Sequence, residues 1–98
     1  MKIEKTLNGT SLTLALSGRL DTTTAPDLEQ EARASLDGMQ TLTLDLAALE
    51  YISSAGLRVL LSMQKTMNKQ GTMIVRNVND TVREVFDITG FSDILTLE

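Results

Sequence analysis

The chain has 98 residues, 42% of them hydrophobic, and a formal net charge of −4. This length suits one domain with a modest core, and the apolar fraction argues against disorder. The absence of cysteine and histidine excludes disulfides, Ser–His and Cys–His nucleophile pairs and most transition-metal sites. The dispersed acidic charge argues against a nucleic-acid surface, which needs a basic face. No apolar run is long enough for a membrane span, and the start lacks a signal-peptide region, so we expect a cytoplasmic protein.

The first forty residues predict a β-hairpin followed by a helix. Residues 2–7 and 11–17 alternate between apolar and polar side chains, and an Asn-Gly pair between them is a strong turn signal. A helix is expected from about residue 25 to residue 36, with a proline in its first turn. Thr24 and Asp27 resemble a capping box at its start, with Asp in place of the usual Glu.

The rest of the chain predicts strands that alternate with helices. Residues 47–50 are too few for a full helix, so we expect a turn there that packs Leu49 and Tyr51. Asn79 or Asp80 is expected to cap the last helix. The sequence therefore predicts an α/β fold with a mixed β-sheet and helices packed on it. Its expected elements after residue 40 are a strand over 41–46, a helix over 55–70, a strand over 72–75, a helix ended by Gly90 and an edge strand over 94–97.

The helix expected over 55–70 has a wider apolar sector than the roughly 100° typical of a core-facing helix. Two interpretations stay open. The helix is buried deeply against the sheet and its neighbours, or one edge stays exposed as a docking strip on which flexible methionines adapt to a partner. The residues of the sector are Leu57, Val59, Leu60, Leu61, Met63 and Met67.

Two serines, Ser53 and Ser54, stand between an expected strand and this helix. A serine here can accept from the first free N–H groups of the helix as an N-cap. The same position attracts negative charge, so a hydroxyl here could also carry a phosphate. Asp21 likewise has two interpretations: a loop carboxylate that bonds nearby backbone N–H groups, or an acidic group beside Ser54 at the end of the sheet.

The run Asp45-Leu46-Ala47-Ala48-Leu49-Glu50-Tyr51-Ile52-Ser53-Ser54-Ala55-Gly56-Leu57 resembles the signature of the STAS domain of bacterial anti-sigma-factor antagonists. Two further blocks match in the same order, Leu16 to Asp21 and Val82 to Phe91. The resemblance covers nearly the whole chain and implies one STAS domain over residues 1–98.

The resemblance implies a partner switch. The serine two residues before the glycine, here Ser54, is the one phosphorylated in the family. The unphosphorylated domain would bind an anti-sigma factor that is also a serine-protein kinase and free a sigma factor, and a serine phosphatase would reset it. The residue before this serine is often Asp in the family and the residue after it is often Ser or Thr, so a negative charge and a hydroxyl are missing here. The residues expected to contact the partner are Asp21, Ser53, Ser54, Ala55, Gly56 and Arg58.

Other functions stay open at this point. One is a STAS-like subunit of a signalling or lipid-transport assembly in which Ser54 is never modified. An enzyme is disfavoured, because a serine nucleophile would need a Lys or carboxylate base and no Ser-x-x-Lys occurs near Ser54. A nucleotide site near Asp21 and Ser54 would lack a Gly-rich phosphate loop. We expect no cofactor, no metal, and a monomer when the protein is free.

Overall fold

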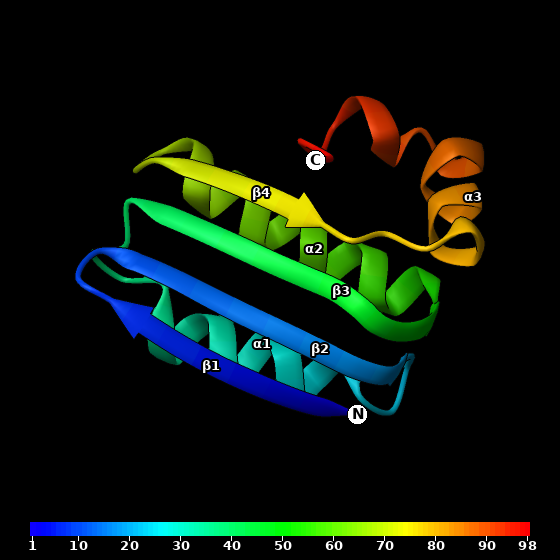
Figure 1. Cartoon of the computed structure of the whole chain (residues 1–98), viewed down its shortest axis with the longest axis horizontal. Helices are drawn as coiled ribbons and strands as arrows, with labels where there is room; N and C mark the ends of the chain where they lie inside the picture. Colours follow the sequence, from blue (N-terminus) through cyan, green and yellow to red (C-terminus); the bar gives the residue numbers. More distant parts are fainter.

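One mixed sheet of four strands, in the order β1-β2-β3-β4, forms the centre of a computed structural model that describes residues 1–98 (Figure 1). Helices α1 and α2 lie on the same face of this sheet, and α3 lies beyond one end of the strands. The elements are β1 (Lys2–Asn8), β2 (Ser11–Leu20), α1 (Ala25–Ser35), β3 (Thr41–Ile52), α2 (Ser54–Asn68), β4 (Thr72–Arg76), α3 (Asp80–Thr89) and a 3₁₀ turn, η1 (Phe91–Asp93).

The pairing of the strands confirms the predicted α/β class with a mixed sheet. β1 and β2 form an antiparallel hairpin, whereas β2 pairs with β3 and β3 with β4 in parallel. Parallel neighbours need a crossover connection, and α1 and α2 supply the two crossovers. The carboxyl ends of β2, β3 and β4 therefore meet at one edge of the sheet, which is the edge where α2 begins.

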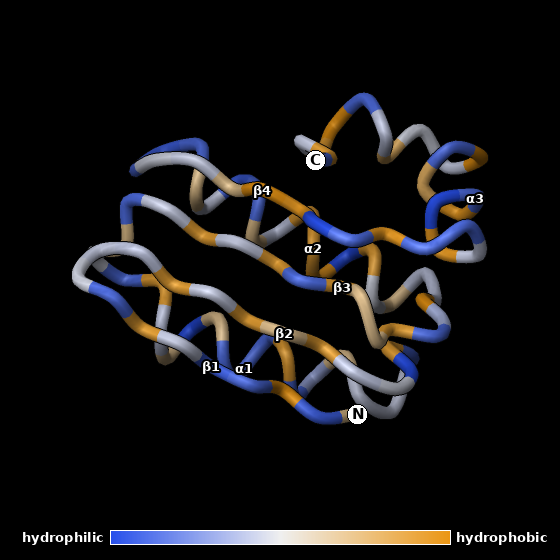
Figure 2. Tube along the Cα trace, viewed as in Figure 1, coloured by the Kyte–Doolittle hydropathy of each residue, from blue (hydrophilic) through white to orange (hydrophobic).

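The core lies between the sheet and the two helices. Hydrophobic positions alternate with more polar ones along β2 and β3 (Figure 2), because successive side chains of a strand point to opposite faces. The opposite face of the sheet is mostly polar and carries threonines. None of the helices has the length and apolarity that a membrane crossing needs. The fully buried side chains of the two central strands are Leu12, Leu14, Leu16, Leu20, Leu42, Leu44, Leu46, Leu49 and Ile52.

The turn predicted over residues 47–50 is wrong, because β3 continues through it to Ile52. The register of β2 and β3 shifts twice, and each shift inserts one extra residue into β3. These are β-bulges, which turn a strand without ending it. Along β3 the spacing of buried residues therefore changes from two to three, at Leu46, Leu49 and Ile52. The bulges keep all three side chains in the core. They also interrupt the alternation of apolar and polar residues by which a strand is predicted from a sequence.

The end of the chain also differs from its prediction. Instead of an edge strand over 94–97, η1 is followed by a single parallel bridge between Val75 and Leu97. Val75 N–H donates to Thr96 O and Glu98 N–H donates to Val75 O, each at 2.9 Å.

At the start of α3, Asn79 is the cap, which is one of the two predicted alternatives. Its side chain accepts from Val82 N–H at 2.9 Å.

Candidate functional site

Ser53 is the residue that joins the end of β3 to the start of α2. Its backbone is extended, with φ −98° and ψ 175°, and its Oγ accepts from Gly56 N–H at 3.4 Å. Its own N–H donates to Leu20 O, the last residue of β2, at 2.9 Å. Ser53 therefore caps α2 and fixes the helix start against the neighbouring strand, which confirms the predicted cap at this position.

Ser54 is the first residue of α2, and its side chain is exposed. Because the Ser53 hydroxyl makes the cap, the Ser54 hydroxyl is not needed for that task. The first turn of α2 contains no acidic residue, so the positive end of the helix dipole is unopposed there. The two serines are adjacent in sequence but differ in role: one holds the helix and the other is presented to solvent.

Gly56 lies buried in the first turn of α2. A Cβ at this position would lie 2.7 Å from Leu20 Cγ and 2.9 Å from Ile52 Cγ1, closer than real side chains approach. The glycine therefore lets the helix start seat directly on the ends of β2 and β3. A contact between Gly56 and a partner stays a prediction, and Gly56 itself is buried.

Asp21 follows β2 at the edge where Ser53 follows β3, so the two loops are neighbours. Its Oδ1 accepts from the N–H groups of Thr24 at 3.1 Å and Thr23 at 3.0 Å. These bonds, that to Thr24 first, with the Arg19 guanidinium 3.9 Å away, hold the pKa of Asp21 below its usual range. The carboxylate thus organises its own loop, and its second predicted role, contact with a partner, stays a prediction.

The capping box predicted at the start of α1 is wrong. Thr24 occupies the cap position but makes no side-chain cap bond. Its hydroxyl instead donates to Arg19 O at 2.8 Å and accepts from Asp21 N–H at 2.9 Å. Thr24 therefore stabilises the loop between β2 and α1, which is the loop beside Ser53.

Arg19 and Tyr51 form a feature of this edge that the sequence reasoning missed. They are register partners on β2 and β3, and the guanidinium carbon lies 4.3 Å from the centre of the tyrosine ring. This distance is typical of a cation–π contact. Tyr51 was expected to pack inside, but 36% of it is exposed. The apolar neighbour Ile52 indicates this exposure, because adjacent residues of a strand face opposite sides and Ile52 is buried.

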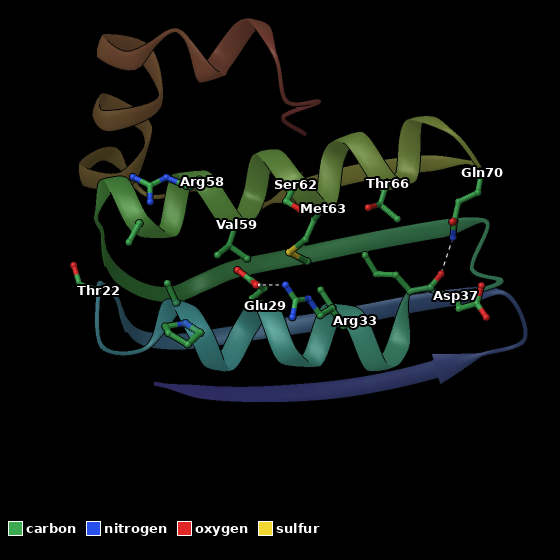
Figure 3. A pocket seen from close by; sticks show the side chains of 15 residues that line it. Thr22, Glu29, Arg33, Asp37, Arg58, Val59, Ser62, Met63, Thr66 and Gln70 are labelled. Atoms are coloured by element: carbon green, nitrogen blue, oxygen red, sulfur yellow. Dashed lines mark hydrogen bonds and ion pairs between the residues drawn. The ribbon is translucent and has the colours of Figure 1, made fainter.

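Ala55 and Arg58, two more of the predicted site residues, line a groove between α1 and α2 with a volume of about 630 Å³ (Figure 3). Ala55 is half-buried and Arg58 is exposed. The two methionines of the α2 sector, Met63 and Met67, are buried, so the deeply buried interpretation of this helix holds for them. No cluster of three or more His, Cys, Asp or Glu side chains is placed to hold a metal ion.

The sequence model of the STAS domain matches residues 2–98. The chain belongs to the STAS domain family. "Putative anti-sigma factor antagonist BtrV" of Bordetella bronchiseptica is 42% identical over 85 residues, which are 85% of this chain and 73% of that protein. An anti-sigma factor antagonist structure from Mycobacterium paratuberculosis is 27% identical, with a TM-score of 0.88 over 98% of this chain and 83% of that one.

Two structures of SpoIIAA from Bacillus, an anti-sigma factor antagonist, share the STAS fold with this chain. The unphosphorylated form has a TM-score of 0.78 and covers 99% of this chain and 87% of that one. The phosphorylated form has a TM-score of 0.77, with coverage of 99% and 91%. Both are 17% identical to this chain, so their likeness concerns the fold alone.

Proposed function

We propose that this STAS domain is an anti-sigma factor antagonist whose binding to an anti-sigma factor is switched off by phosphorylation of Ser54. The names of the relatives support the first part of the proposal. The observation that carries the second part is the exposed hydroxyl of Ser54 at the first position of α2, beside a serine that already caps the helix.

The choice between the two serines follows from their bonds. A phosphate on Ser53 would replace the hydroxyl that accepts from Gly56 N–H, and Ser53 is half-buried against β2. A phosphate on Ser54 displaces no bond of the cap and extends into water. A kinase can therefore reach Ser54 without opening the helix start.

The domain tolerates a phosphate on Ser54 because of where α2 begins. A phosphoserine carries about −1.5 to −2 charges at neutral pH, and a helix N-terminus stabilises negative charge. No acidic side chain in the first turn opposes it. Arg58 stands four residues later, at the spacing that pairs side chains along a helix. The fold should therefore persist in the phosphorylated state.

The same phosphate is unfavourable in a complex. A partner that closes over the start of α2 has to strip water from a doubly charged group. Arg58 can offset only part of this charge, and leaving the rest buried without a partner costs about 3–5 kcal/mol, which weakens binding more than about a hundredfold. The switch is thus a change of charge at an exposed surface and requires no refolding.

The resemblance to anti-sigma factor antagonists suggests the partners. The unphosphorylated domain binds an anti-sigma factor that is also a serine-protein kinase, and this frees a sigma factor. The kinase phosphorylates Ser54 and releases the domain, and a serine phosphatase restores it. In this scheme the domain acts in the cytoplasm as a regulatory binding protein rather than an enzyme, and it is a monomer when free.

Phosphosite mapping tests the proposal. The kinase is captured from the source cell with the domain as bait, and the two are then incubated with ATP. We expect one phosphate per chain, on Ser54, and none on Ser54→Ala. The matched control is Ser53→Ala, which keeps the Ser54 hydroxyl and should still be phosphorylated. A phosphate on Ser53, or full phosphorylation of Ser54→Ala, would contradict the assignment.

A further inference from the structure

The groove between α1 and α2 exists because the two helices present small side chains to each other. Ala25 and Ala32 of α1 and Ala55 of α2 line it. Alanines cannot fill the space between two helices as larger side chains do when ridges pack into grooves. The space of about 630 Å³ lies within the range of roughly 300–1,000 Å³ that small-molecule sites occupy.

The groove has an apolar floor and polar walls. The walls are exposed, and they include the hydroxyls of Ser62 and Thr66 on α2. The apolar floor suits the body of an apolar ligand, and the polar walls suit a polar or charged end group. The floor consists of the buried or half-buried side chains of Ala25, Ala32, Leu36, Ala55, Val59 and Met63.

The two ends of the groove differ in charge (Figure 3). Arg58 stands at the end where α2 begins, and Asp37 stands at the opposite end. There Gln70 Nε2 donates to Leu36 O at 2.6 Å and Met39 O at 2.7 Å, which ties the two helix ends together. From Arg58 to Asn68, the last residue of α2, the helix rises about 15 Å, at about 1.5 Å per residue. The groove is therefore elongated, cationic at one end and anionic at the other.

Arg58 is the only one of the five arginines that makes no ion pair within the chain. Arg33, which also lines the groove, is neutralised by Glu29 at 2.6 Å. Arg58, which lines the groove, thus carries an uncompensated guanidinium next to the positive end of the α2 dipole. An anionic group is the natural complement of this end.

We propose that the α1–α2 groove binds an amphipathic monoanion, a medium-chain alkyl carboxylate, with its carboxylate at Arg58 and its alkyl chain along the apolar floor. Asp37 sets the orientation, because it repels the carboxylate from the far end. The site belongs to the unphosphorylated protein, because a phosphate on Ser54 would compete with the ligand for Arg58.

Methyl-resolved NMR titration with decanoate tests the site. We expect saturable one-to-one binding that shifts the methyl signals of Ala55, Val59 and Met63. Decanol lacks the charge and butyrate lacks the length, so each should bind at least about fivefold more weakly, the scale of a partly exposed ion pair. Shifts confined to other methyl groups would overturn the proposal. Decanol binding as tightly as decanoate would also overturn it, and would assign the groove to a neutral apolar group such as a partner's side chain.

Two variants with a control complete the test. Arg58→Gln should weaken decanoate binding about fivefold, whereas Lys65→Gln, which removes an exposed cation of α2 outside the groove, should not. Ala32→Leu fills the floor and should abolish binding while the melting temperature stays the same or rises. If Ala32→Leu is unstable, the Arg58→Gln result decides alone. Unchanged affinity in Arg58→Gln, or in a folded Ala32→Leu, would overturn the proposal.

Discussion

Ser54→Asp should leave the domain as stable as the wild type or make it more stable. The residue is exposed at the first position of α2, so the change buries no charge. A carboxylate at a helix N-terminus contributes about 0.3–1 kcal/mol. A pair with Arg58, four residues later, adds about 0.2–0.5 kcal/mol. For a domain of this size, a gain of about 1 kcal/mol corresponds to a rise in Tm of about 4–8 °C.

Thermal and urea unfolding measure this effect, with Ser54→Asn as the uncharged control of nearly the same shape. The gain should appear in Ser54→Asp alone and should largely vanish at about 1 M salt, where the Debye length falls to about 3 Å. A loss of more than about 1 kcal/mol in Ser54→Asp but not in Ser54→Asn would refute the reasoning. It would mean that negative charge is not tolerated at the start of α2 and that phosphorylation would disturb the fold.

Two further changes test the surroundings of this site. Gly56→Ala should destabilise the domain by about 1–3 kcal/mol in urea unfolding, since a Cβ there overlaps Leu20 and Ile52; unchanged stability would show that the helix start is not seated tightly. Bonds from Asn77 and from Ala47 N–H hold the pKa of Asp45 below its usual range, so its charge stabilises the fold above about pH 4 and this contribution is lost as the pH falls through the lowered pKa. Melting curves of wild type and Asp45→Asn should therefore converge at low pH, and a gap that widens on acidification would contradict this.

The arrangement of strands and helices could be predicted wherever the sequence pattern has a single period. The hairpin of β1 and β2 follows from alternation on both sides of an Asn-Gly pair, and α2 follows from the apolar spacing after Gly56. The cap at Ser53 follows from its place between the two patterns. These features depend on interactions between residues close together in the sequence, so they can be predicted from it.

The features that were missed depend on contacts between distant residues. The bulges of β3 come from its register with β2, and they turn the alternation into spacings of three that read as a turn. Thr24 fits a cap by its sequence, but in the fold its hydroxyl bonds Arg19 O instead. The contact of Arg19 with Tyr51 requires the same register. The groove between α1 and α2 depends on how the alanine-bearing faces of the two helices pack together. Local sequence patterns do not predict this packing.

Titration calorimetry of the captured kinase with the domain, before and after phosphorylation, tests the central claim most directly. The unphosphorylated protein and Ser54→Ala should bind with similar affinity. The phosphorylated protein should bind more than about a hundredfold more weakly, because a doubly charged group would be buried without a partner, and Ser54→Asp should also bind weakly. If the phosphorylated protein binds as tightly as the unphosphorylated one, Ser54 is not the switch.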